Sequence, residues 1–255
     1  MTFEPPLAPP PAPGHAVSRL RSARLAASAK PFVARGSGSG RCAGCRLTAS
    51  HCLCAWRPQA PARAGVCLVM GDIEALKPSN TGWLVADVVA DTWAFGWSRT
   101  EVDPGLLALL ADPQWQPYLV FPGEFAPPER VVTDLTPATP APERKPLFVL
   151  LDGTWSEARK MFRKSPYLDH LPVLSLEPEQ VVSNYRLRRS SRESHFCTSE
   201  VAALCLALAG ENHAAGTLAA WLDVFTEHYL SIKRGLPLNL ASEAHLRLQA
   251  LRAVD

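Results

Sequence analysis

The sequence lacks three features that would assign it to large classes of protein. No run of 18 apolar residues occurs among its 255 residues, so we expect no transmembrane helix. Residues 1–30 contain no continuous apolar segment, and they therefore do not predict a secretory signal peptide. A large excess of charge of one sign is also lacking, because the sequence has 26 lysines and arginines and 24 acidic residues. With a net charge of +2, any binding of an anionic partner must come from local basic clusters.

Proline, alanine, serine and glycine dominate residues 1–40. Such a segment cannot bury enough apolar surface to offset the entropy lost on ordering, so we predict a disordered tail. Its basic residues have two conceivable roles, contact with nucleic acid or plain solvation. They are Arg19, Arg21 and Arg24.

Residues 63–255 alternate apolar strands with helical patterns. The strands are apolar throughout, which is typical of a mainly parallel sheet covered by helices on both faces. We therefore predict one α/β domain over residues 63–255, with no internal repeat. Strands are expected at 65–70, 117–123, 147–151 and 172–178, and helices at 83–93, 106–113, 156–164, 199–211 and 218–235.

Polar motifs follow three of these strands. Open parallel sheets bind ligands at the carboxyl ends of their strands, which lie along one edge. We therefore expect the three motifs to form one site. They are Ser79-Asn80-Thr81-Gly82, Phe121-Pro122-Gly123 and Asp152-Gly153-Thr154-Trp155.

Asp152 stands at the end of the apolar run 147–151. An aspartate there could cap the next helix, but Thr154 and Glu157 fit a capping box better. With Thr154 as the cap, the Asp152 carboxylate has no structural assignment. The residues alone leave open whether it is functional.

The tripeptide Asp-Thr-Trp also occurs literally, at residues 91–93. It ends a helical pattern and has no apolar strand directly before it. We interpret Trp93 as a core residue and Asp91 as a surface residue.

Four of the seven cysteines fall within thirteen residues, in the spacing C-x2-C-x6-C-x-C. Such clustering without a secretory signal favours a metal over disulfides and predicts a reducing cytoplasm. Four thiolates complete a tetrahedral structural zinc site with no open position for catalysis. A reduced surface cluster, adventitious disulfides, or His51 in place of one cysteine are the alternatives. The predicted ligands are Cys42, Cys45, Cys52 and Cys54.

Basic residues gather in two places. Arg41, Arg46 and Arg57, with Trp56, flank the cysteines, where they could contact RNA or form a solvated face. Four more follow Asp152 on the predicted helix, where they fit either phosphate binding or the negative end of the helix dipole. These are Arg159, Lys160, Arg163 and Lys164.

The stretch DGTWSEARKMFRKSP resembles the signature of DTW-domain proteins. The loop at 79–82, the F-P-G turn at 121–123, the element at Tyr185–Arg188 and the helix start at 197–200 resemble further family motifs, in the same order. The four-cysteine segment is similar to that of bacterial members, and the likeness covers residues 41–235. Cys197 stands where the family pattern has serine.

This resemblance implies a SPOUT-like mainly parallel sheet with a deep trefoil knot. It also implies a tRNA-uridine aminocarboxypropyltransferase that uses S-adenosylmethionine as the donor. The enzyme would attach the 3-amino-3-carboxypropyl group to N3 of a tRNA uridine, in the variable loop, and release 5'-methylthioadenosine. Zinc would be structural.

The resemblance also implies roles for individual residues. Asp152 would accept the N3 proton, with a pKa raised by burial, or would only orient the uracil or the donor. Thr154 and Trp155 complete the catalytic set. Residues expected to bind the donor are Ser79, Asn80, Thr81, Gly82, Phe121, Pro122, Gly123, Arg186, Arg188, Thr198 and Glu200. Residues expected to bind RNA are Arg159, Lys160, Arg163, Lys164 and Arg189.

Three other functions remain open at this point. A SPOUT-like RNA methyltransferase would use the same donor but release S-adenosylhomocysteine. An aminocarboxypropyltransferase could act on ribosomal RNA instead of tRNA. A zinc-containing RNA-binding protein would carry no activity at all.

Overall fold

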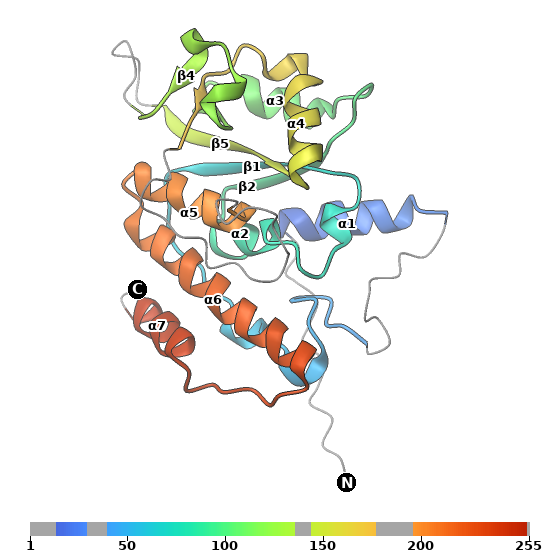
Figure 1. Ribbon diagram of the computed structural model, residues 1–255, viewed down its shortest axis with the longest axis vertical. Helices are drawn as coiled ribbons and strands as arrows, with labels where there is room; N and C mark the ends of the chain where they lie inside the picture. Colours follow the sequence, from blue (N-terminus) through green and yellow to red (C-terminus); the bar gives the residue numbers. More distant parts are fainter. Residues whose placement is uncertain (1–13, 30–39, 136–143, 177–195, 254–255) are drawn as a thin grey trace.

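The structure is a computed structural model that describes residues 14–29, 40–135, 144–176 and 196–253. Within these ranges six strands form one sheet in the order β2-β1-β5-β3-β6-β4, and each neighbouring pair is parallel (Figure 1). The predicted α/β fold with a mainly parallel sheet is confirmed. The strands are β1 (Gly65–Met70), β2 (Thr92–Gly96), β3 (Trp115–Val120), β4 (Val131–Val132), β5 (Lys145–Asp152) and β6 (Val173–Leu174).

Helices cover both faces of the sheet (Figure 1). Helices α3 and α4 lie on one side, and α2, α5 and α6 lie on the other, with α7 packed beyond α6. The helices are α1 (Ala16–Ala26), α2 (Gly82–Val88), α3 (Pro104–Ala111), α4 (Trp155–Arg163), α5 (Thr198–Leu208), α6 (Asn212–Arg234) and α7 (Glu243–Arg252).

Two apolar clusters fill the spaces above and below the sheet. In β1, Val66 and Leu68 join the cluster under α2, α5 and α6, whereas Cys67 and Val69 join the cluster under α3 and α4. All four side chains are fully buried. Alternate side chains of a strand point to opposite faces, so a sheet buried on both faces needs strands without polar positions. This explains the unbroken apolar runs in the sequence.

The parallel register brings the carboxyl ends of the central strands to one edge. Met70, the last residue of β1, pairs with Asp152, the last residue of β5. Val120, which ends β3, pairs with Leu150 of β5. The chain leaving each of these strands therefore starts at the same edge of the sheet, as expected for a binding site in this class of fold.

Ordered structure begins earlier than the composition predicts. Helix α1 falls within residues 1–40, where we expected a tail. His15 caps it by accepting a hydrogen bond from the N–H of Ser18, and Val17 is fully buried. Arg21 donates to the carbonyl of Leu76 at 2.8 Å. These contacts with distant residues stabilise a helix whose own sequence shows little amphipathic pattern.

Two further expectations concern the whole molecule. Within the described ranges, no helix has both the length and the apolar character needed to cross a membrane. The trefoil knot implied by the resemblance stays a prediction.

Candidate functional site

Asp152 lies at the carboxyl end of β5 with only 2% of its surface exposed. Its Oδ2 accepts a hydrogen bond of 2.7 Å from Nδ2 of Asn80. Its Oδ1 accepts a second one, also of 2.7 Å, from Oγ1 of Thr198. The carboxylate thus joins three segments that lie far apart in the sequence: the loop before α2, the end of β5 and the start of α5.

The loop at 79–82 is held closely against this carboxylate. Asn80 is 1% exposed, and its Oδ1 accepts from the N–H of Trp83 at 3.1 Å, so both ends of its side-chain amide are engaged. A Cβ atom at Gly82 would lie 2.8 Å from Asp152 Oδ2, which is closer than van der Waals contact. Only glycine lets the loop approach the carboxylate this closely.

The first turn of α5 is tied to the same loop. Glu200 accepts a 2.7 Å hydrogen bond from the N–H of Cys197, as in a capping box. The N–H of Ser199 donates to Thr81 Oγ1 at 3.4 Å. Burial, followed by the charge of Glu200, raises the pKa of the Cys197 thiol, so this residue is a neutral N-cap. Glu200 therefore shapes the helix start that presents Thr198.

Thr154 caps α4 with a full capping box, as predicted. Its hydroxyl accepts from the N–H of Glu157, whose carboxylate accepts from the N–H of Thr154 at 2.8 Å. Trp155, the next residue, is 40% exposed. Its ring is stacked on Phe121, with the centroids 5.4 Å apart and the planes 8° from parallel. Phe121 in turn stacks on Phe162 of α4 at 4.4 Å.

The F-P-G turn is anchored to the sheet through Gly123. The N–H of Gly123 donates to Ser175 Oγ at 3.0 Å. A Cβ at Gly123 would lie 3.0 Å from Val131 and 3.1 Å from Ser175. The turn therefore packs against the ends of β4 and β6, and it places Phe121 under Trp155. The sequence did not reveal the contribution of Ser175, which belongs to no motif.

Exposed cations lie along α4, beside the strand ends. The guanidinium of Arg159 lies 4.9 Å from the centre of the Phe125 ring, and the ammonium of Lys160 lies 5.4 Å from that of Trp97. Arg163 and Lys164 are exposed in the same helix end. Arg186, Arg188 and Arg189 lie outside the described residues, and their roles stay predictions.

The literal Asp-Thr-Trp at 91–93 lies at the other edge of the sheet. Asp91 precedes β2, and Thr92 pairs with Val66 near the start of β1. Because the strands are parallel, this position is at the amino-terminal edge, opposite Asp152. Trp93 is partly buried in strand β2 and packs edge to face against Trp115, so it does contribute to the core.

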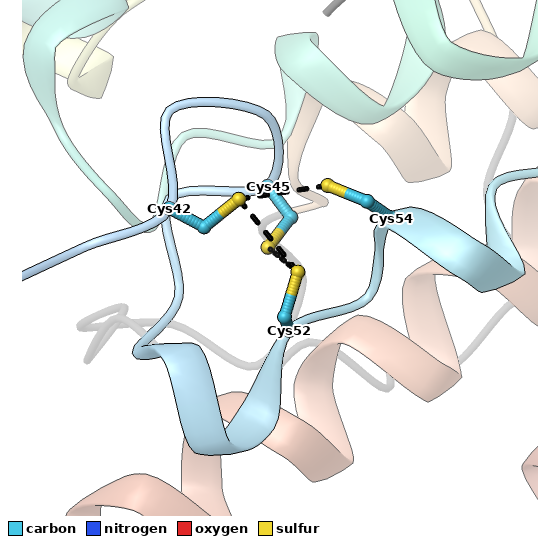
Figure 2. Close-up of side chains that lie close together, drawn as sticks. All are labelled: Cys42, Cys45, Cys52 and Cys54. Carbon is cyan, nitrogen blue, oxygen red and sulfur yellow. Dashed lines mark hydrogen bonds between the residues drawn. The ribbon is translucent and has the colours of Figure 1, made fainter. Parts of the chain in front are cut away.

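The four predicted metal ligands come together near the N-terminus of the domain (Figure 2). Their sulfur atoms all lie within 4.8 Å of one another, with 3.6 Å between Cys42 and Cys54 and 3.7 Å between Cys45 and Cys52. Zinc–sulfur bonds of about 2.3 Å in a tetrahedron require sulfurs roughly 3.8 Å apart. The cluster therefore has the geometry to hold a metal ion, consistent with structural zinc.

Electrostatics within the cluster already favour one thiolate. A hydrogen bond from Cys54 is the largest effect on Cys45 and lowers its pKa to about 5, against the opposing effect of burial. The N–H of Leu53 also donates to the Cys45 sulfur, at 3.4 Å. Burial raises the pKa of Cys52 to about 11. A divalent cation would stabilise all four thiolates together.

Arginines around the cysteines do not form the solvated basic face that was one of our alternatives. Arg46 is 3% exposed and lies against the ring of Trp83. Arg57 pairs with the buried carboxylate of Asp87 at 2.8 Å. No sequence pattern separates these arginines from surface ones, because their partners lie in α2 and in the loop before it.

A family model described as the DTW domain matches residues 39–230, about three quarters of the chain, and includes both the cysteine cluster and every segment that meets at Asp152. No solved structure matches the chain significantly.

Proposed function

The chain belongs to the DTW-domain family, and on that premise we propose that it is a tRNA-uridine aminocarboxypropyltransferase. Family membership is consistent with a function in tRNA modification. The proposed reaction transfers the 3-amino-3-carboxypropyl group of S-adenosylmethionine to N3 of a uridine, in the variable loop of tRNA. The products are the modified uridine and 5'-methylthioadenosine.

The observation that best supports this proposal is the environment of Asp152. A carboxylate that is 2% exposed stands at the ligand-binding edge of a parallel sheet. Its Oδ2 accepts a hydrogen bond from Asn80, and its Oδ1 accepts one from Thr198. The carboxylate is therefore held in an orientation fixed by two partners from different segments, at the edge of the sheet where a substrate N–H would approach it.

The chemistry requires such an acceptor. Uracil N3 carries a proton and is a weak nucleophile until that proton is removed. In the proposed reaction Asp152 accepts the N3 proton, and N3 forms a bond to the donor carbon next to sulfur. The bond between that carbon and sulfur breaks, and its electron pair stays on sulfur. When bound, S-adenosylmethionine supplies an activated carbon beside its positive sulfonium.

The other residues position the reactants. We assign donor binding to the loop at 79–82, to the turn at 121–123 with Trp155, and to the start of α5 with Thr198. The exposed cations of α4 supply contacts to RNA phosphates, which make the binding salt-dependent. The four cysteines hold zinc as a structural ion, because four thiolates leave no position for a substrate.

The test is product identification. Zinc-loaded protein is incubated with S-adenosylmethionine and unmodified tRNA, and the small molecules and digested nucleosides are analysed by mass spectrometry. Methylthioadenosine together with a uridine carrying the aminocarboxypropyl group is the expected result. S-adenosylhomocysteine with a methylated nucleoside would assign the protein to the methyltransferases instead. RNA binding without turnover on tRNA or ribosomal RNA would refute the enzyme proposal.

A matched control for substitution of Asp152 uses the literal Asp-Thr-Trp at residues 91–93. Asp91→Asn makes the same change at the literal Asp-Thr-Trp, whereas Asp152 stands in Asp-Gly-Thr-Trp at the opposite edge of the sheet. We expect this variant to retain full turnover. Its inactivation would mean that the edge containing Asp152 is not the reaction site.

A further inference from the structure

Arg46 belongs to the cysteine segment, but its side chain reaches the loop that holds the catalytic carboxylate. It follows Cys45 directly, and it is 3% exposed. Its Nη1 donates to the main-chain carbonyl of Asn80 at 2.9 Å and to that of Lys77 at 3.4 Å. Hydrogen bonds from a charged donor are about twice as strong as those between neutral groups. These two therefore fix both ends of the turn from 77 to 80.

Aromatic rings hold the same guanidinium from the sides. Its central carbon lies 4.4 Å from the centre of the Trp83 ring and 5.4 Å from that of Phe225. Both rings are buried, and cation–π attraction is strongest where water is excluded. Trp83 is also the residue whose N–H donates to the Asn80 side chain. The guanidinium thus contacts both the main-chain carbonyl of Asn80 and the ring of Trp83.

The main chain at Arg46 is held in an uncommon conformation by the cysteine turn. Its φ of 65° makes it the only positive-φ residue other than glycine among those described. Its N–H donates to the Cys42 carbonyl at 2.8 Å, and the N–H of Cys42 donates to the Leu47 carbonyl at 2.7 Å. Glycine would adopt this conformation at no steric cost. A strained residue persists where the surrounding structure requires it and often marks a functional contact.

We infer that Arg46 is a positioning residue that couples metal binding by the four cysteines to the placement of Asn80, and through Asn80 to Asp152. The metal fixes the turn from Cys42 to Cys45, the turn aims the guanidinium, and the guanidinium holds the loop. The Asn80 side chain then donates to Asp152 at 2.7 Å. A metal held by the four cysteines would thereby influence the donor site. The donor-binding consequence depends on the function proposed above; the coupling itself does not.

A second residue of the cysteine segment contacts the C-terminal end of α2, the helix that follows the loop at 77–80. Arg57, which follows Cys54, pairs with Asp87 near the end of α2. The cysteine segment therefore contacts α2 in its last turn and also contacts the loop before its first turn. This arrangement resists rotation of α2, which would otherwise move Gly82 relative to Asp152.

The experiment compares hydrogen exchange of residues 77–84 with and without metal, in wild type and in Arg46→Gly. Glycine relieves the backbone strain and removes only the side chain. In wild type, a chelator should speed exchange in this segment about tenfold or more, as expected for loss of charge-assisted hydrogen bonds. In metal-loaded Arg46→Gly the exchange should already be fast, and the chelator should add little. Peptides from α4, on the other face of the sheet, provide the internal reference.

Several results would overturn the inference. Slow exchange in Arg46→Gly would show that the guanidinium does not hold the loop. An equal response to chelator in both proteins would show that the metal acts by another route. Loss of metal from Arg46→Gly, measured by elemental analysis, would make Arg46 a support of the metal site itself. If Arg46→Gly does not fold, Arg46→Lys replaces it; intermediate exchange is then expected, and wild-type protection would refute the idea.

A second measurement tests the consequence for the donor site. Calorimetry should show S-adenosylmethionine binding about tenfold more weakly to Arg46→Gly and to chelated wild type, with tRNA affinity unchanged. Arg247→Lys is the control, because that arginine pairs with Asp223 on the surface of α6 and α7. Wild-type affinity in Arg46→Gly would contradict the inference. If even metal-loaded wild type binds no S-adenosylmethionine, the proposed function fails, while the exchange experiment still decides the coupling.

Discussion

Substitution of Asp152 separates the energetic role of this carboxylate from its chemical role. Asp152→Ala removes the acceptor of two hydrogen bonds at once. Asn80 is 1% exposed, so its amide loses its partner in a place that water does not reach, at a cost of about 1–3 kcal/mol. Thr198 is half-buried, and its hydroxyl can turn to water at a cost of about 1 kcal/mol. We therefore expect Asp152→Ala to lose about 2–4 kcal/mol of unfolding free energy.

Asp152→Asn preserves the shape and most of the hydrogen bonding. Its Oδ1 can accept from the Asn80 amide, and its Nδ2 can donate to the Thr198 hydroxyl, which is able to act as an acceptor. The loss in stability should be about 1 kcal/mol, since only the charge-assisted character is lost. The amide cannot accept a proton, however. Turnover should fall by roughly 10²–10⁴-fold, the typical contribution of a general base.

Urea denaturation at fixed zinc concentration measures the stabilities, and single-turnover formation of methylthioadenosine measures the chemistry. Asp152→Ala with wild-type stability would refute our reading of the buried hydrogen bonds. Asp152→Asn with wild-type turnover would refute a proton-accepting role and leave orientation of the substrate as the function of this residue. Turnover by Asp152→Asn that is low but independent of pH would favour the base, because the titrating group is gone.

Three further outcomes are expected. Gly82→Ala should destabilise the protein by about 1–3 kcal/mol in urea, because its Cβ would lie 2.8 Å from Asp152 Oδ2; stabilisation, as is usual for glycine to alanine in a helix, would contradict this. Cys42→Ser with Cys45→Ser should lower the melting temperature, as a chelator should in wild type, and no change with chelator would exclude a structural metal. Burial lowers the pKa of His228 from 6.5 to about 4. Between pH 4 and pH 6.5 this residue is therefore protonated in the unfolded chain but neutral in the folded protein. The free energy of unfolding should therefore be unaffected by this residue above pH 6.5 and should fall by up to about 3 kcal/mol towards pH 4. An equally steep pH dependence of stability in His228→Asn would show that His228 is not the cause.

The fold was predictable where local patterns carry the information. The run at 65–70 became β1 with the same bounds, because an unbroken apolar segment of this length suits only a strand buried on both faces. The capping box at Thr154 and the cysteine cluster were also visible, since each depends on residues close in the sequence. The order of the strands was not predictable, because it depends on which apolar faces meet across long connections.

The candidate site was predictable only in part, for the same reason. The strand-end motifs placed Asn80 and Asp152 at one edge of the sheet, and the family resemblance added Thr198, but neither predicted the hydrogen bonds between them. Nothing in the sequence indicated that Arg46 would be buried, because its partners Lys77 and Asn80 lie more than thirty residues further along the chain. Helix α1 was missed because its stability comes from contacts with the loop at 74–76 rather than from its own pattern.

The contacts that build the site span long distances along the chain. Arg46 and Asn80 are 34 residues apart, Asn80 and Asp152 are 72 apart, and Asp152 and Thr198 are 46 apart. Each contact closes a loop at an entropic cost that the local segment cannot recover by itself. The carboxylate is therefore desolvated and oriented only when the cysteine segment, the sheet and α5 are assembled together. This ties the placement of the Asp152 carboxylate to cooperative folding of the whole domain, and it connects the cysteine turn with the edge of the sheet where that carboxylate lies.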